Sequence, residues 1–243
     1  MKKSFSAIVF GGSIIIASIF LGNAYVDRNK TQGTVQVTGL GKADFTSDLI
    51  VWSASFNVLD PDLKQAYAAL EQSKQIIQNY LNNKGVPGDQ VVFTAVQSRE
   101  ETKNRYSSSG DYIGEDFVGY VLSQTVQIES GEVEKIEQIS RQITELLNQG
   151  VNLYSDSPRY YYTKLADLKI EMISKATEDA YVRAQKIAQN SGGDLGELQS
   201  AKMGVFQITG QNSTEDYSWG GTFNTSSKKK TASITMKLVY ETD

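Results

Sequence analysis

Histidine and cysteine, the side chains on which much nucleophilic catalysis and metal binding depend, are absent from the chain. Ser-His-Asp and Cys-His nucleophile systems therefore cannot form within it. The same absence excludes zinc, haem and iron–sulfur sites built from these residues. Only carboxylates, lysines, tyrosines and backbone dipoles remain for chemistry. No constellation of them indicates a reaction, so the sequence predicts no catalytic residue, no cofactor and no metal site.

Two pairs of adjacent acids come nearest to a catalytic motif. Glu100-Glu101 and Glu115-Asp116 flank a polar segment, and glycosidases use paired carboxylates. Adjacent residues on a strand point to opposite faces, so each pair offers one inward carboxylate at most. We interpret both pairs as solubilising rims of a loop. The same region, with Asp111, lacks the twelve-residue pattern of a calcium loop.

Two other motifs have simpler structural interpretations. Gly39-Leu40-Gly41-Lys42 resembles part of a phosphate-binding loop, but it lacks the full spacing and a following helix, so we interpret it as a strand bend. The basic run Lys228-Lys229-Lys230 is interpreted as the solvated start of a strand, with a lipid or polyanion contact as the alternative. The net charge of −4 and the pI near 5.1 argue against a nucleic-acid partner.

Two long polar segments are candidates for contact loops. They are Tyr106 to Asp116 and Gly210 to Ser227, and both combine serine, glycine and acidic residues with aromatic side chains. Such segments are either mobile hairpin tips or adaptable recognition loops. The expected contact residues are Tyr106, Tyr112, Tyr217, Trp219 and Phe223. Tyr160-Tyr161-Tyr162 should alternate across a strand, with one face in the core and Tyr161 facing the other way.

The elements that must position these residues form a first strand-helix-strand-strand series. Leu49 to Leu59 alternates as a half-buried strand, with Trp52 on the apolar face. Asp60-Pro61 predicts an N-cap and first helical residue, and Lys84-Gly85 predicts the helix end. Strands are expected from Gln90 to Glu101 and from Phe117 to Ile128.

The same order recurs in the second half. A strand region from Val151 to Tyr162 precedes a helix that Thr163 caps and that Ser191-Gly192-Gly193 ends. Strands from Leu198 to Ile208 and from Thr231 to Tyr240 follow. A helix from Glu132 to Asn148, with Ser130 as its N-cap, joins the two series. Alanine every fourth residue in the long second helix makes a smooth packing stripe: Ala176, Ala180, Ala184 and Ala188.

The N-terminal segment is expected to be a membrane anchor. After Lys2 and Lys3 the chain is uncharged from Ser4 to Val26, which as a helix would be roughly 34 Å long and would cross a hydrocarbon core of about 30 Å. The lysines place its start in the cytoplasm and the rest outside, in the periplasm. The alternative is a cleaved signal peptide with Gly22-Asn23-Ala24 as its site, which would leave a secreted soluble periplasmic protein.

The predicted fold is therefore α+β, with two βαββ units whose antiparallel sheets are packed by helices, preceded by the anchor. Residues 1–26 are the anchor or signal peptide, 27–32 a polar stalk, and 33–243 the folded domain, with repeats at about 49–129 and 151–240. Thr231 to Tyr240 has one lysine, Lys237, and no proline, so it is expected to be an unguarded sheet edge. A homo-oligomer is therefore expected, and a monomer is the alternative.

Three segments resemble the SIMPL domain family. They are VQVTGLGKADFTSDLIVWSASF, the pair Gly119-Tyr120 leading into LSQTVQI, and the alanine-striped helix ending in NSGGDLGEL, so the resemblance covers Gly33 to Tyr240. It implies an exported bacterial protein similar to periplasmic immunogenic antigens and oxidative-stress defence proteins. It also implies βαββ units and ring-like oligomers, with no agreed enzymatic residues. The retained anchor and the longer, aromatic second loop depart from the family pattern.

The expected function is non-catalytic. Self-assembly or partner binding in the cell envelope fits the composition, and a role in envelope or oxidative stress tolerance is what the resemblance implies. The alternatives are an envelope enzyme with carboxylate or tyrosine chemistry and a ligand-binding module with the two loops at its mouth. The membrane is the expected partner of the N-terminal helix.

Overall fold

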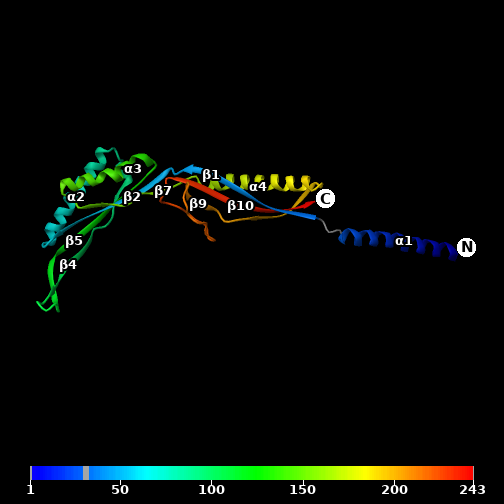
Figure 1. The fold of residues 1–243 in the computed structure, drawn as a ribbon, viewed down its shortest axis with the longest axis horizontal. Helices are drawn as coiled ribbons and strands as arrows, with labels where there is room; N and C mark the ends of the chain where they lie inside the picture. The colour runs from blue at the N-terminus through cyan, green and yellow to red at the C-terminus, as the bar shows by residue number, and fades with distance from the viewer. Residues whose placement is uncertain (1, 30–32, 243) are drawn as a thin grey trace. The chain divides into compact units, whose positions relative to one another are not determined.

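The computed structural model describes residues 2–29 and 33–242, with side chains described for 11–25 and 33–242 (Figure 1). Its helices are α1 (Lys2–Asn29), α2 (Leu63–Asn83), α3 (Val133–Gln142) and α4 (Leu165–Asn190), with 3-10 segments at Gly88–Gln90 and Ile143–Gln149. Its strands are β1 (Gly33–Thr46), β2 (Leu49–Asp60), β3 (Val91–Phe93), β4 (Gln97–Tyr106), β5 (Tyr112–Ser130), β6 (Leu153–Ser155), β7 (Arg159–Tyr161), β8 (Leu195–Met203), β9 (Gln207–Gly210) and β10 (Lys229–Thr242). Strands pair antiparallel in two sheets, so the predicted α+β class is confirmed.

The chain divides into two compact units. The smaller consists of Met1–Gly41, Lys175–Gly204 and Thr235–Asp243, and the larger of Lys42–Ser174 and Val205–Ile234. In the larger unit a sheet has the order β3-β5-β2-β6, with β4 also on β5 and β7 also on β2. The strand region that precedes α4 in the sequence thus pairs with β2, whereas β8, β9 and β10 belong to the other sheet.

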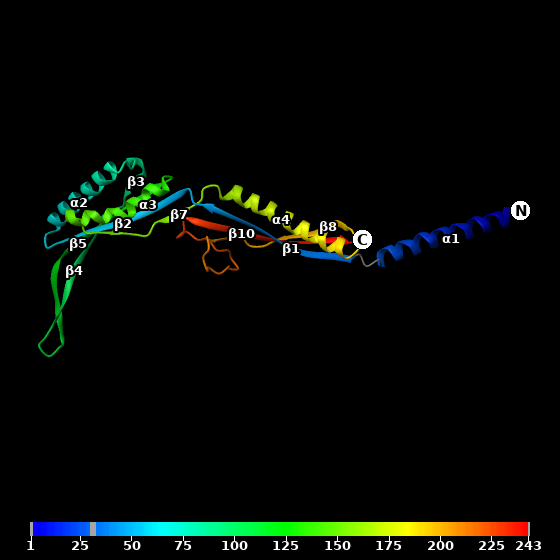
Figure 2. The same ribbon diagram turned by 45° about the horizontal axis from the view of Figure 1, so that its top comes forward.

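Helices α2 and α3 cover one face of the larger unit's sheet (Figures 1 and 2). Strand β2 turns its even-numbered side chains towards them, and Trp52, Phe56 and Ile50 are fully buried there. The Trp52 indole N–H donates to the Ser155 hydroxyl over 3.0 Å, so the polar edge of this buried ring is satisfied. The core is completed from α2, α3, the 3-10 segment after α3, and β5, chiefly by Leu70, Ile77, Leu81, Val126, Ile128, Ile136 and Ile143.

The first predicted loop is mostly strand. β4 and β5 pair from Gln97↔Ser123 to Tyr106↔Tyr112, so the turn is confined to 107–111. The prediction of a loop over Tyr106 to Asp116 was wrong because serine, glycine and acidic residues can lie on an exposed ribbon as well as in a turn. The single predicted strand from Gln90 to Glu101 is likewise divided into β3 and β4.

Two predicted helix caps are displaced. Asp62, not Asp60, caps α2, since its carboxylate accepts from the backbone N–H groups of Lys64 and Gln65 over 2.9 and 3.0 Å. Asp60 instead accepts from the N–H of Asp62. Glu132 occupies the N-cap position of α3, while the Ser130 hydroxyl accepts from the N–H of Glu132. Helix α3 also ends at Gln142, where a 3-10 segment begins.

In the smaller unit, the predicted alanine stripe is buried and packs against β1. Ala176, Ala180 and Ala184 are fully buried. A Cβ added at Gly39 would collide with the backbone of Ala176 and with Ala180, so only glycine allows this approach of strand and helix. The backbone N–H of Leu40 also donates to the Asp179 carboxylate over 2.8 Å. The Gly39–Lys42 motif is therefore a packing feature of β1.

Strand β10 is central in its sheet, which has the order β1-β10-β8 with β9 also on β10. The prediction that Thr231 to Tyr240 forms an open edge was therefore wrong. Its predicted apolar face is confirmed, because Ala232, Ile234, Met236, Leu238 and Tyr240 are all buried. The single lysine and the lack of proline reflect a strand that is paired on both sides.

Helix α1 spans the whole uncharged N-terminal run from Ser4 to Val26. Within the described residues, no helix has the length and apolar character needed to cross a membrane. Residues 30–32 of the expected stalk lie outside the described part of the chain.

The two tryptophans provide a matched test of this fold. Trp52 is 1% exposed and Trp219 fully exposed. Trp52→Ala should lower the free energy of unfolding by about 3–5 kcal/mol, because it removes a large buried side chain. Trp219→Ala should change it by less than about 0.5 kcal/mol. Denaturant titration followed by circular dichroism measures both, and a Trp52→Ala variant as stable as wild type would mean that the strand's face is misassigned.

Candidate functional site

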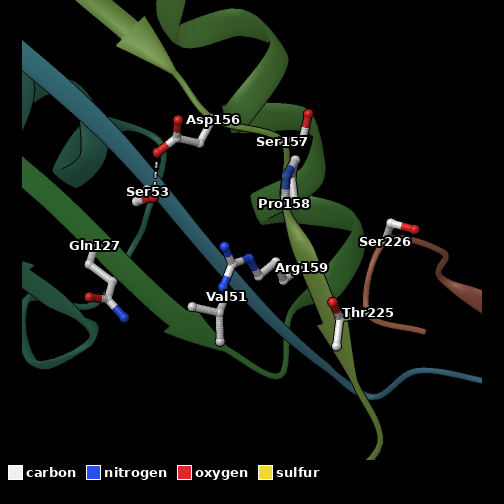
Figure 3. A pocket seen from close by; sticks show the side chains of 9 residues that line it. All are labelled: Val51, Ser53, Gln127, Asp156, Ser157, Pro158, Arg159, Thr225 and Ser226. Atoms are coloured by element: carbon white, nitrogen blue, oxygen red, sulfur yellow. Dashed lines mark hydrogen bonds between the residues drawn. The ribbon is translucent and has the colours of Figure 1, made fainter. Parts of the chain in front are cut away.

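A polar pocket of about 570 Å³ lies on the face of the larger unit's sheet opposite to the core (Figure 3). Its volume falls within the range of small-molecule sites. Its lining comes from β2, β5, the link between β6 and β7, and the segment before β10. The lining residues are Val51, Ser53, Gln127, Asp156, Ser157, Pro158, Arg159, Thr225 and Ser226.

The alternation of strands β2 and β5 makes the floor of the pocket. Ser53 pairs with Gln127 in the ladder, so the two side chains lie together on one face. Their neighbours Trp52 and Ile128 point into the core and are buried. The core therefore holds the floor in place from behind.

The β6–β7 link, residues 156–158, forms one wall together with Arg159. Asp156 is tied to Ser53 twice, because its N–H donates to the Ser53 carbonyl over 3.0 Å and its carboxylate accepts from the Ser53 hydroxyl over 2.7 Å. Arg159 pairs with Val51 in the ladder between β7 and β2. In Figure 3 the side chains of Asp156 and Arg159 both project from this wall over β2.

A buried lysine holds the opposite wall, Thr225 and Ser226. Lys230 is 2% exposed, and its ammonium donates to the carbonyls of Tyr160 and Asn224, each over 2.6 Å. The N–H of Tyr160 donates to the Thr225 carbonyl over 2.7 Å. These bonds fasten the loop to β7, since two of the three ammonium donors are engaged by backbone carbonyls.

Burial lowers the pKa of Lys230 to about 8, and the nearby Glu215 carboxylate opposes this shift in part. Glu215 is itself held by the N–H of Gly210 and by the Asn224 side chain, and these bonds lower its pKa. The ring of Phe223 lies over the ammonium, 5.9 Å from ring centroid to Nζ. The wall of the pocket is therefore held by a lysine whose surroundings disfavour its charged form.

Lys228 was also predicted to be a solvated residue at the start of a strand, and it is not. Its ammonium lies 2.6 Å from a Glu137 carboxylate oxygen, and the bond lowers the pKa of Glu137 and raises that of Lys228. Of the run Lys228-Lys229-Lys230, only Lys229 is exposed, so the interpretation as a solvated face was wrong. The signal lay in the alternation, because Lys230 has the same parity as the buried residues Ala232 and Ile234.

The pocket lining combines opposite charges with hydroxyl and amide groups. It contains one carboxylate, Asp156, and one guanidinium, Arg159. A second carboxylate, which glycoside hydrolysis would need, is not among the lining residues. The arrangement is suited to binding a polar molecule. Sequence reasoning overlooked Asp156 and Arg159 because a short link between minor strands carries no recognisable motif.

The acids considered for catalysis lie apart from this pocket, on the β4–β5 ribbon. Glu101 pairs with Arg99 over 2.8 Å, and Asp116 with Arg105 over 3.3 Å. Glu115 accepts from the Thr102 hydroxyl over 2.7 Å. Glu101, Glu115 and Asp116 thus each bond to a cation or a hydroxyl group of the ribbon. Among the described residues, no group of three or more His, Cys, Asp or Glu side chains could hold a metal ion.

The predicted contact residues form two exposed groups. Tyr106 and Tyr112 face each other at the tip of the ribbon, with ring centroids 6.1 Å apart. Tyr217, Trp219 and Phe223 are exposed on the second loop. The Tyr217 hydroxyl accepts from Ser233 over 3.2 Å, and Thr222 and Asn224 bond to the backbone of Ile208, so this loop is tied down on both sides of its aromatic tip. In the run Tyr160-Tyr161-Tyr162, one face was expected to enter the core, and Tyr160 does so.

Comparison with protein families places most of the chain in one family. Residues 35–240 match the SIMPL family, which is described as a protein of unknown function (DUF541). The chain therefore belongs to the SIMPL family, and the resemblance drawn from its motifs is confirmed. No curated protein matches the chain.

The buried lysine predicts a measurable pH dependence. Because the pKa is about 8 in the folded protein and 10.5 unfolded, the unfolded state binds more protons between these values, and stability should rise with pH by roughly 1 kcal/mol per unit. The pKa values of Tyr160 and Tyr240 are raised from their ordinary value of 10, so above pH 10 these two groups make the stability fall as the pH rises. The effect of Lys230 is therefore measured between pH 8 and pH 10.

Lys230→Met should abolish this rise, whereas the exposed Lys229→Met should retain it. Denaturant unfolding at intervals from pH 7 to pH 10 measures the slope for each protein. An equal slope in the wild type and in Lys230→Met would contradict the assignment.

Proposed function

We propose that this member of the SIMPL family is a non-catalytic protein of the cell envelope that acts through self-association or partner binding. The observation that carries the proposal is the arm formed by β4 and the N-terminal half of β5, residues 98–106 and 112–118. A two-stranded ribbon is marginally stable alone in water, which favours an arm that gains partners on assembly.

The arm exposes apolar side chains along its length. Those that are 37–57% exposed are Tyr106, Tyr112, Ile113, Phe117 and Val118. Isolated exposed apolar residues are ordinary, but a concentration of them on one projection is typical of an interaction surface. Figure 2 shows the ribbon extending away from α2 and α3, so the helices that cover the sheet leave the arm bare.

Both edges of the arm are open within the described residues. β4 pairs with β5 alone, and β5 pairs with β2 only from Tyr120 onward. Open edges offer backbone donors and acceptors to a strand of another chain. Alternating charges on β4 restrict which strand can add. In a two-fold symmetric antiparallel pair of β4 edges, the register that places Arg99 opposite Glu101 of a second copy also places Glu100 opposite Glu100, and like charges directly opposite are destabilising, so this register is disfavoured.

The enzyme alternative has weaker support. Three of its four proposed acids, Glu101, Glu115 and Asp116, are bonded to cations or hydroxyls of the arm, whereas a carboxylate acid or base in catalysis acts on a bound substrate. The ligand-binding alternative gains support from the polar pocket, which lies away from the two aromatic loops that were expected to form its mouth.

Oligomer mass tests the role of the arm. Both sheets and both buried regions lie within Gly33–Thr242, so residues Gly33–Asp243 are a suitable sample. We expect light scattering at micromolar concentration to give a mass above that of a monomer, with an interface of about 1,000 Å² or more. Ile113→Lys with Phe117→Lys should reduce the mass, and Tyr154→Ser, an exposed residue outside the arm, should not. A clean monomer in the wild type would overturn self-association.

The envelope location rests on the uncharged run from Ser4 to Val26 after Lys2 and Lys3. In this proposal the run remains as an inner-membrane anchor, and the folded units lie in the periplasm. Stress tolerance is a role that the resemblance suggests.

N-terminal sequencing of the protein from cells separates anchor from signal peptide. We expect the chain to retain its first residues, because the apolar run exceeds the roughly 7–15 residues of a signal-peptide core. A mature chain that begins at Tyr25 would refute the anchor and leave a soluble exported protein.

A further inference from the structure

The two charged groups of the polar pocket, Asp156 and Arg159, do not form an ion pair with each other. Within the described residues, Arg159 has no ion-pair partner, and the Asp156 carboxylate accepts a side-chain bond only from Ser53. Structural arginines on the arm behave differently, since Arg99 and Arg105 each pair with an acid. An unpaired guanidinium and a half-satisfied carboxylate on one wall of a cavity are placed to receive charges from a ligand.

The charge balance of the pocket selects the class of ligand. One positive and one negative group give the lining no net charge, so a ligand with complementary poles leaves the filled pocket neutral. A phosphate or other multiply charged anion would be repelled by Asp156. No aromatic ring is among the lining residues, so there is no platform on which a nucleobase could stack.

We propose that this pocket binds a small zwitterion of the size of a dipeptide. Its carboxylate lies against the Arg159 guanidinium, which presents a planar donor fork, and its ammonium group lies against the free oxygen of Asp156. Gln127, Ser157, Thr225 and Ser226 supply donors and acceptors for the peptide group between the poles. The cavity volume of about 570 Å³ accommodates more than a single amino acid.

The walls are organised before the ligand enters. Asp156 is held by two bonds to Ser53, and the Thr225 segment is held through Tyr160 and Lys230. Asp156 and the Thr225 segment therefore lose little freedom on binding, whereas the exposed Arg159 side chain gains its order from the ligand. This inference does not rest on self-association, because the pocket is lined by residues outside the arm.

Calorimetric titration of the full chain in a non-ionic detergent with L-alanyl-L-alanine is the test. We expect saturable binding that weakens at least about tenfold when either end of the probe is blocked, as in N-acetyl-alanyl-alanine or alanyl-alanine amide, because each block removes a charge-assisted bond. Glucuronate, an acidic sugar of similar size, should bind at least about tenfold more weakly than the dipeptide.

Variants place the binding in this pocket. Arg159→Gln and Asp156→Asn should each weaken dipeptide binding at least about tenfold, and Asn can still accept the bond from Ser53. Arg99→Gln, an exposed arginine of the same sheet outside the pocket, should bind as wild type does. Ile113→Lys with Phe117→Lys should also retain binding, which separates this test from that of assembly.

Three results would overturn the proposal. They are no dipeptide binding at millimolar concentration, equal binding of glucuronate, and unchanged affinity in both pocket variants with unaltered circular dichroism.

Discussion

The alternation of side chains along β2 is the constraint on which the larger unit depends. Its even-numbered residues, including Trp52 and Phe56, must be buried under α2 and α3, so Val51 and Ser53 must face the other way. A shift of one residue in pairing would exchange the two faces. The same packing that stabilises the core thus positions the floor of the polar pocket, so the chemistry of the pocket is a consequence of the register.

Lys230 extends the ordered structure of the sheet into the second loop, Gly210 to Ser227. Its ammonium binds the carbonyls of Tyr160 and Asn224, so one end of the second loop is fixed to the sheet while Trp219 at its tip remains fully exposed. An apolar side chain of similar length, such as methionine, would be easier to bury, but it has no donor for either carbonyl. The lysine combines a destabilising burial with a specific tether, which is why its protonation is linked to the stability of the fold.

The apolar periodicities were readable in the sequence, and the pairing of the strands was not. Trp52, the alanine stripe of α4 and the buried face of β10 followed from spacing alone, because burial repeats with the geometry of the element. The central position of β10, the pairing of β6 and β7 with β2, and the length of the arm depend on contacts between distant residues.

The candidate site, too, could be predicted only in part from the sequence. The aromatic loop residues were proposed from composition and stay a prediction, whereas Asp156 and Arg159 gain meaning only when the register brings them beside Ser53 and Val51. The burial of Lys230 could be predicted in part. The strand alternation that it shares with Ala232 indicates burial, but the carbonyls that make this burial tolerable come from other segments.

Strand β5 joins the two surfaces to which we assign binding. Its pairing with β2 continues without a shift from Tyr120 to Ser130, which includes Gln127 on the pocket floor. Beyond Tyr120, towards the arm, pairing with β4 contains register shifts near Glu101 and Arg105, where irregular pairing bends and twists a ribbon. The regular part therefore serves a site that needs fixed geometry. The irregular part lies at the open edge for which we propose a partner strand, and such a strand could follow its twist. Edge pairing leaves the sheet face free, so association through the arm and binding of a small ligand in the pocket are compatible within one protomer.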